Sequence, residues 1–256
     1  MSQKIIRFRD KEKGNIAYGL TDGQKVTVLK QAPWESMEIS KQTAVLSEVT
    51  LLAPVEPSKI ICIGLNYHAH VAASQSADEA PEYPLIFLKP SSSVIGPGEK
   101  IVHPPQSERV DYEAELGVVI GKTAKNVSPD TAEEYILGFT CVNDVTARDL
   151  QKKDGQWSRA KGFDTFCPVG PWIVTELDYR DVLVEGVLND EVKQSGRTSL
   201  MIFNIPFLIS YISSIMTLNP GDLISTGTPA GIAPMKPGDK IEVRVEGIGT
   251  LQNHMA

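Results

Sequence analysis

The chain has 256 residues, of which 41% are hydrophobic and 22% charged, and its formal net charge is −7 at pH 7. These values are ordinary for a globular protein with one sizeable core, and they exclude a disordered or fibrous chain. The negative net charge also argues against nucleic acid or an anionic membrane surface as a partner.

The N-terminal segment, MSQKIIRFRDKEKG, has charges between its apolar residues, so it does not match the core of a signal peptide. No apolar run approaches the ~20 residues of a membrane-spanning helix. Cys62, Cys141 and Cys167 lie in or beside apolar runs without CxxC spacing, which indicates reduced, buried thiols. We therefore expect a cytoplasmic protein without a membrane segment.

The N-terminal part is predicted to be a small β-rich module. Its strands are predicted at residues 5–8, 15–20 and 26–29. A helical or irregular stretch is expected to follow. Pro54 and Pro57 then interrupt regular structure. We accordingly predict an N-terminal module over residues 1–54 and a catalytic domain over residues 59–256.

The remainder is predicted to contain many short strands and two helices. The strands are expected at residues 60–63, 85–88, 113–120, 139–142, 172–174, 182–192, 223–226 and 241–245. Asn189-Asp190 indicates a hairpin turn. One helix is expected from Ser128-Pro129 to about Gly138, and an amphipathic core helix over residues 205–216. The fold class is therefore mixed α/β and β-dominated.

Acidic and apolar residues alternate along residues 111–120. Asp111, Glu113 and Glu115 take the odd positions, so a strand here places three carboxylates on one face. Neighbouring carboxylates repel each other unless water screens them or a cation neutralises them. This segment alone is consistent with either a solvated strand face or a metal site.

A further acidic residue, Asp144, follows the apolar run 139–142. Carboxylates without histidine or cysteine make a hard oxygen site, which favours Mg²⁺ or Mn²⁺ over zinc. Glu113, Glu115 and Asp144 are therefore candidate metal ligands. For Arg148 and Asp149 we favour the interpretation of a structural ion pair.

Other polar residues are more ambiguous. Residues 224–231 form a strand followed by a loop with two glycines, which can bring backbone N–H groups close to an anionic ligand. A simple strand-to-turn corner has the same pattern. For Lys89 and Lys161 a functional role and a plain surface position are equally open, because an isolated lysine is usually a solvated surface charge.

Six segments together resemble the fumarylacetoacetate hydrolase family, in particular its short bacterial and mitochondrial members that hydrolyse acylpyruvates or act on oxaloacetate. The segments are residues 64–70 (GLNYHAH), 87–90 (FLKP), 111–116 (DYEAEL), 143–149 (NDVTARD), 160–166 (AKGFDTF) and 226–229 (TGTP). The resemblance implies a mixed β-sandwich roll with a small N-terminal β module, usually assembled as a homodimer.

The resemblance also implies roles for individual residues. It implies that Glu113, Glu115 and Asp144 bind Mg²⁺ or Mn²⁺, and that Lys161 stabilises negative charge developing on the substrate. The residues predicted to bind the substrate are Lys89, Arg148, Gln151, Gly227 and Thr228. The implied substrate is a small 2-oxo acid, whose enolate a metal ion at this site would stabilise as a Lewis acid. Such a site supports C–C hydrolysis, decarboxylation of oxaloacetate or keto–enol tautomerisation.

The chain departs from the hydrolytic members at one position. These members carry a histidine and, three residues later, a glutamate, and the pair activates water. His70 matches the catalytic histidine, but position 73 is Ala73. Glu79 and Asp78 are the candidates to replace the missing acid.

Hydrolysis of a C–C bond in an acylpyruvate-like 2,4-dioxo acid is therefore the first functional prediction from family membership. Oxaloacetate tautomerase or decarboxylase is the alternative that Ala73 favours, because loss of the glutamate affects water activation more than proton transfer. A protein of this fold that binds metal and ligand without catalysis is a third hypothesis.

Overall fold

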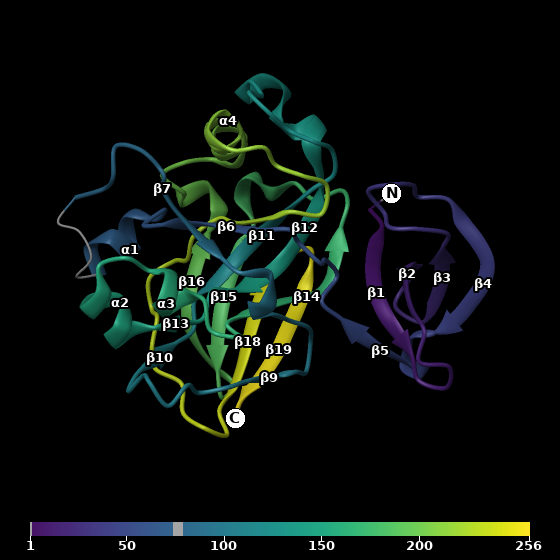
Figure 1. Cartoon of the computed structure of the whole chain (residues 1–256), viewed down its shortest axis with the longest axis horizontal. Coiled ribbons are helices and arrows are strands. Elements are labelled where there is room, and N and C mark those ends of the chain that lie inside the picture. The colour runs from purple at the N-terminus through teal and green to yellow at the C-terminus, as the bar shows by residue number, and fades with distance from the viewer. Residues whose placement is uncertain (1, 74–78) are drawn as a thin grey trace.

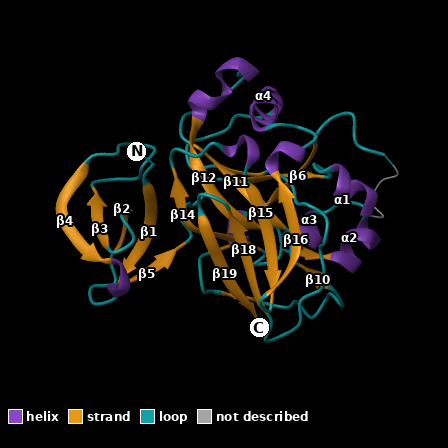
Figure 2. Cartoon of the chain, turned by 180° about the vertical axis from the view of Figure 1, so that it is seen from behind, coloured by secondary structure: helices purple, strands orange, loops and turns teal. Residues whose placement is uncertain are grey.

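The computed structural model describes residues 2–73 and 79–256, and within these residues the chain forms three β-sheets with a few short helices (Figures 1 and 2). Strands outnumber helices and build most of the core. The predicted β-dominated, mixed α/β fold is confirmed.

The largest sheet runs through both halves of the molecule. Its N-terminal strands are β1 (Lys4–Asp10), β2 (Ile16–Thr21), β3 (Lys25–Leu29), β4 (Ile39–Val45) and β5 (Val49–Leu52). Its other strands are β6 (Ile60–Gly64), β7 (Leu85–Lys89), β8 (Val94–Ile95), β11 (Ala114–Ile120), β12 (Ile136–Asn143), β14 (Cys167–Val174) and β17 (Leu223–Ser225). The main strand order is β4-β3-β2-β1-β14-β12-β11-β17-β6-β7, with β5 paired to β1 and β8 to β14.

A five-stranded sheet packs on the large one. It consists of β16 (Glu191–Arg197), β15 (Leu183–Leu188), β18 (Lys240–Val245), β19 (Gly249–Met255) and β9 (Lys100–Ile101), in this order. Leu116 and Val118 of β11 share one buried cluster with Val184 and Val243 of this sheet. A two-stranded sheet of β10 (Val110–Asp111) and β13 (Thr146–Ala147) completes the set.

The helices are short. They are α1 (His68–Ala73), α2 (Arg148–Asp154), α3 (Ser158–Lys161) and α4 (Ile205–Ile215), with 3₁₀ segments η1 (Leu46–Glu48), η2 (Ser91–Ser93), η3 (Pro129–Tyr135), η4 (Tyr179–Asp181) and η5 (Thr198–Leu200). Helices α1, α2 and α3 lie at the end of the molecule opposite the N-terminal strands β1 to β4 (Figures 1 and 2). None of the helices in the described part of the chain is long and apolar enough to cross a membrane.

Strand β11 lies in the middle of the large sheet and is buried along its whole length. Val118 belongs to the cluster shared with the five-stranded sheet, whereas Val119 packs on the other face with Ile5 and Ile60. Both faces of the strand are therefore covered. A solvated acidic face on this strand is excluded by the packing.

Two sequence predictions of secondary structure were wrong. The stretch after residue 30 contains strands β4 and β5; β4 is an edge strand that is mostly exposed and so lacks an apolar signal. The expected helix from Ser128 to Gly138 is only the 3₁₀ segment η3, and β12 begins at Ile136. Gly138 lies within that strand, where a Cβ atom would come 2.4 Å from the carbonyl oxygen of Val174 on β14.

Other expectations are confirmed. Asn189 and Asp190 connect β15 to β16 with φ angles of 50° and 68°, as the hairpin turn requires. Helix α4 covers the predicted amphipathic segment. Cys62, Cys141 and Cys167 are free and buried.

The side chain of Gln194 links the two sheets beside the start of β11. Its Oε1 accepts from the backbone N–H of Ala114 at 2.9 Å, and its Nε2 donates to Thr228 Oγ1 at 2.8 Å and to the Pro229 carbonyl at 2.7 Å. Because Gln194 is fully buried, its removal would leave backbone groups without partners.

We expect Gln194→Ala to lower the free energy of unfolding by about 1–3 kcal/mol, because buried groups lose their hydrogen bonds. Denaturant titration followed by circular dichroism measures the change. Gln252→Ala, at an exposed site on β19, is the matched control and should stay within about 0.5 kcal/mol of the parent. Equal effects of the two substitutions would contradict this role of Gln194.

Candidate active site

Three buried carboxylates meet at the ends of two central strands. Strands β11 and β12 are antiparallel with Ala114 opposite Asn143, which brings Glu113 and Asp144 together. The backbone N–H of Asp144 donates to the Glu113 carbonyl at 2.9 Å. One carboxylate oxygen from each of Glu113, Glu115 and Asp144 lies within 4.8 Å of the others. The sequence-predicted acidic cluster is therefore assembled in the fold.

Two lysines reach this cluster from distant segments. Lys161, the last residue of α3, donates to Glu113 Oε2 at 2.8 Å and to Asp144 Oδ2 at 2.6 Å. Lys89, the last residue of β7, donates to Asp144 Oδ1 at 2.6 Å and to the Val145 carbonyl at 2.9 Å. Both lysines are buried, so the interpretation of solvated surface charges is wrong for them.

Arg148, the first residue of α2, is the third cation of the cluster. Its Nη2 donates to Glu113 Oε1, and its Nε donates to Asp111 Oδ2 at 2.9 Å. The expected ion pair between Arg148 and Asp149 was wrong, because the Asp149 carboxylate instead accepts from Ser107 Oγ at 2.5 Å. Consecutive residues at the start of a helix point in different directions, which separates these two side chains.

Glu115 has neutral partners. Its Oε2 accepts from Ser225 Oγ at 2.5 Å and from the backbone N–H of Gly227 at 2.8 Å. Gly227 has φ +99°, a backbone conformation that favours glycine. The loop after β17 thus aims an N–H at an acceptor, and this acceptor is a carboxyl oxygen of the protein itself. The role of Ser225 was not foreseen, because it depends on the pairing of β17 with β11.

The partners set the charge states of the cluster. Burial alone would raise the pKa of Glu113, but the adjacent Lys161 and Arg148 outweigh it and hold that pKa well below its ordinary value. Burial would lower the pKa of Lys161, but Asp144 and Glu113 hold it well above its ordinary value. For Glu115, burial and then the negative charges of Asp144 and Glu113 raise the pKa to about 8.

This arrangement fits a divalent metal ion. Its donors are carboxylate oxygens without histidine or cysteine, as hard cations prefer. Glu115 is the one member of the carboxylate trio that has no cationic hydrogen-bond partner among the described residues. Burial, and then the negative charges of Asp144 and Glu113, raise its pKa, and a cation held by the three carboxylates would favour its ionised form.

His70 lies beside the cluster on α1 and is buried. Burial lowers its pKa, and the nearby Glu113 only partly offsets that effect. Gln151 on α2 lies close by and accepts from Arg148 Nη1 at 2.6 Å. Ala73 ends α1 and is exposed. Of the two candidates to replace its missing acid, Glu79 is exposed and does not line the pocket, and Asp78 lies outside the described residues.

The pocket over the cluster contains most of the predicted site residues. Those lining it are His70, Glu113, Glu115, Asp144, Arg148, Gln151, Lys161 and Thr228. Lys89 and Gly227 lie behind it, against Asp144 and Glu115. Its wall also includes Phe87 and Trp157, whose rings meet edge to face at 5.2 Å and which the sequence did not identify. The free volume of this pocket is about 20 Å³, enough for about one water molecule.

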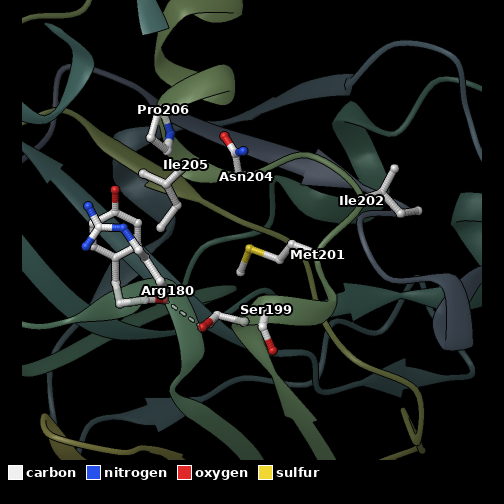
Figure 3. Close-up of a pocket in the computed structure, with 9 residues that line it drawn as sticks. Arg180, Ser199, Met201, Ile202, Asn204, Ile205 and Pro206 are labelled. Atoms are coloured by element: carbon white, nitrogen blue, oxygen red, sulfur yellow. Dashed lines mark hydrogen bonds between the residues drawn. The ribbon is translucent and has the colours of Figure 1, made fainter. Parts of the chain in front are cut away.

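A larger cleft of about 410 Å³ lies elsewhere, between η4, η5 and the start of α4 (Figure 3). Arg180, Met201 and Asn204 are among its lining residues, and no predicted site residue is. Arg180 is already paired with Glu133 and Asp178. The predicted site residues therefore gather at the smaller, carboxylate-lined pocket and not at this cleft.

This combination of a β-rich roll and a carboxylate cluster defines the class of protein. Residues 59–256 match the family described as fumarylacetoacetate (FAA) hydrolase, C-terminal, and residues 3–54 match Rv2993c-like, N-terminal. The chain belongs to the fumarylacetoacetate hydrolase family, as the sequence motifs predicted.

Individual relatives support the family assignment. Uncharacterized protein MJ1656 of Methanocaldococcus jannaschii is 54% identical over 78% of this chain and 84% of its own length. Oxaloacetate tautomerase YisK of Bacillus subtilis is 44% identical over 82% of this chain and 74% of its own. The crystal structure of 5-carboxymethyl-2-hydroxymuconate delta-isomerase from Mycobacterium smegmatis is 44% identical, with a TM-score of 0.92 over 99% of both chains. A homodimer and a cytoplasmic location stay predictions.

Because the pKa of Glu115 is raised to about 8, metal binding near neutral pH must displace a proton. We expect the apparent affinity for Mn²⁺ to rise with pH, by up to about tenfold per unit, and to level off above about pH 8. Calorimetry in buffers of different ionisation enthalpy measures both affinity and protons released. Equal affinity at about pH 6 and pH 8 would contradict the raised pKa.

Proposed function

We propose that the chain is a Mg²⁺- or Mn²⁺-dependent enzyme that interconverts the keto and enol forms of a small 2-oxo dicarboxylate such as oxaloacetate. The observation that carries the proposal is the cluster of Glu113, Glu115 and Asp144, surrounded by buried cations and adjoining His70. The names of two relatives, a tautomerase and an isomerase, support proton transfer as the reaction.

The cations of the pocket suit a doubly negative substrate. Arg148 and Lys161 are permanently charged in this setting, since their pKa values are raised by the carboxylates around them. Glu113, Glu115 and Asp144 would hold the metal ion. Lys161, whose Nζ lies against Glu113 and Asp144, would hold a substrate carboxylate or the oxygen that becomes negative in the enolate.

The metal ion, when bound, would polarise the 2-oxo group and lower the energy of the enolate. Proton transfer itself falls to His70. Its lowered pKa leaves the imidazole neutral at pH 7, so it can accept a proton from C3 of the keto form and deliver it to the 2-oxygen to give the enol, with both steps reversed in the opposite direction. Protonation of His70 at low pH would remove this function.

The second candidate is hydrolysis of a C–C bond in an acylpyruvate, the first prediction from the sequence. The position of His70 beside the pocket favours it, because a histidine can activate water as well as move a proton. In the described residues α1 ends at Ala73, without the glutamate of the hydrolytic members. Tautomerisation needs no activated water, and for that reason we place it first.

The first experiment follows both tautomers of oxaloacetate by absorbance, with Mn²⁺ or with a chelator. We expect metal-dependent interconversion without pyruvate release, and His70→Asn to lower kcat by about 10²–10⁴-fold while Mn²⁺ affinity stays the same. Pyruvate release would identify a decarboxylase. Inactivity on oxaloacetate and acetylpyruvate alike would contradict the proposal and favour a binding protein.

A second experiment tests why hydrolysis is disfavoured. We expect Ala73→Glu to raise the rate of acetylpyruvate hydrolysis relative to oxaloacetate tautomerisation, because it places a carboxylate three residues after His70. Ala72→Glu is the matched control, since Ala72 is also exposed on α1 but one residue out of phase. If both variants changed the ratio equally, position 73 would have no special part in water activation.

A further inference from the structure

Two arginines lie on one face of β1, where the N-terminal strands meet the rest of the molecule. Side chains alternate along a strand, so Arg7 and Arg9 share a face with Ile5. Ile5 is buried in the core cluster that includes strands β6 and β14, whereas Ile6 and Phe8 on the other face belong to a separate N-terminal cluster. The arginine face of β1 is therefore turned toward the junction.

A cavity of about 330 Å³ lies at this junction. Its walls come from β1, from the linker between residues 52 and 57, and from residues between 91 and 99. Since one water molecule takes about 30 Å³ of liquid volume, a small organic anion fits. The cavity shares no lining residue with the carboxylate pocket, and β1 lies at the opposite end of the molecule from α1, α2 and α3 (Figure 1).

Only part of the Arg7 guanidinium has a hydrogen-bond partner. Its Nη2 pairs with Glu56 Oε1 at 2.6 Å, but its Nε is buried and has no hydrogen-bond partner among the described residues. Arg109 and Arg159 show the usual arrangement, in which Nε and Nη2 both donate to one aspartate. A buried N–H without an acceptor is rare, so Arg7 offers a donor that an anion would satisfy.

The other charges at the junction permit such an anion. The side chain of Glu56 is 66% exposed, so its contact with Arg7 is screened by solvent and easily exchanged. Glu99 accepts from the backbone N–H of Gly96 and is held by its own loop. Arg9 is exposed and makes no ion pair within the described chain. Arg9, which has no ion-pair partner among the described residues, therefore lies two residues along the strand from Arg7, whose Nε has no hydrogen-bond partner.

We propose that this cavity binds a small anion with two acidic groups, carboxylate or phosphate, as a site separate from the carboxylate pocket. One group accepts from both Nε and Nη2 of Arg7 and displaces Glu56. The second group pairs with Arg9, about 7 Å away along the strand. A short dicarboxylate or a compact phosphorylated acid has this spacing. The proposal does not depend on the reaction proposed for the carboxylate pocket.

The test uses the full-length protein labelled with ¹⁵N and follows the Nε–H signal of Arg7, which is assigned by its loss in Arg7→Lys. Succinate and inorganic phosphate are the probes, and neutral succinamide is the control ligand. We expect succinate or phosphate, but not succinamide, to move this signal in a saturable way. Response to only one of the two anions would identify the preferred acidic group and support the site.

Two variants report on the mechanism of binding. Arg9→Gln, at an exposed position where the fold should be unaffected, should weaken succinate binding by roughly tenfold or more. Glu56→Gln should strengthen it, because the competing carboxylate is removed. Glu12→Gln is the control for net charge. Glu12 is an exposed acid in the loop between β1 and β2, and its substitution should change the affinity less.

Three results would overturn the proposal. The first is an Arg7 Nε–H signal that responds to neither anion at millimolar concentration. The second is unchanged succinate binding in Arg9→Gln. The third is equal strengthening of binding by Glu56→Gln and Glu12→Gln, which would mean that the anion senses only the overall charge of the protein.

Discussion

Burial of charge at the junction of β11 and β12 is the constraint on which the other features of the site depend. Carboxylates removed from water are costly unless hydrogen bonds and opposite charges compensate them. Glu113 and Asp144 receive that compensation from Lys89 on β7, Arg148 on α2 and Lys161 on α3. The positions of β7, α2 and α3 are thus tied to the same small set of charges.

The three carboxylates are not compensated equally, and this difference determines which of them favours an added cation. Glu115 receives only neutral donors from Ser225 and Gly227. The cluster accordingly has one carboxylate that favours an added cation. It also has one lysine, Lys161, that bridges two of the three proposed ligands. In the proposed mechanism this lysine would also contact the substrate, so the metal site and the substrate site would share one cationic side chain.

In the proposed mechanism, the step that follows enolate formation depends on α1 rather than on the carboxylate cluster. His70 would act as a neutral base, and position 73 is Ala73 instead of the glutamate that would help to activate water. At the junction, Arg7 pairs through one nitrogen with the exposed Glu56, and Arg9 makes no ion pair among the described residues. One chain thus presents a carboxylate-rich pocket at one end and an arginine-lined cavity at the other.

The sequence by itself determined the local patterns of this protein. Alternation along residues 111–120 placed Glu113 and Glu115 on one face, Asn189-Asp190 made a hairpin turn, and helical spacing identified α4. Six ordered motifs were sufficient to identify the family.

Only the tertiary structure decided which partners these residues meet. It buried the acidic face of β11, separated Arg148 from Asp149, and brought Ser225 to Glu115. It also made residues 39–45 an edge strand, although their side chains carry little apolar signal. The physical reason is that alternation and turn geometry are properties of neighbouring residues, whereas burial and ion pairing depend on segments brought together by sheet packing.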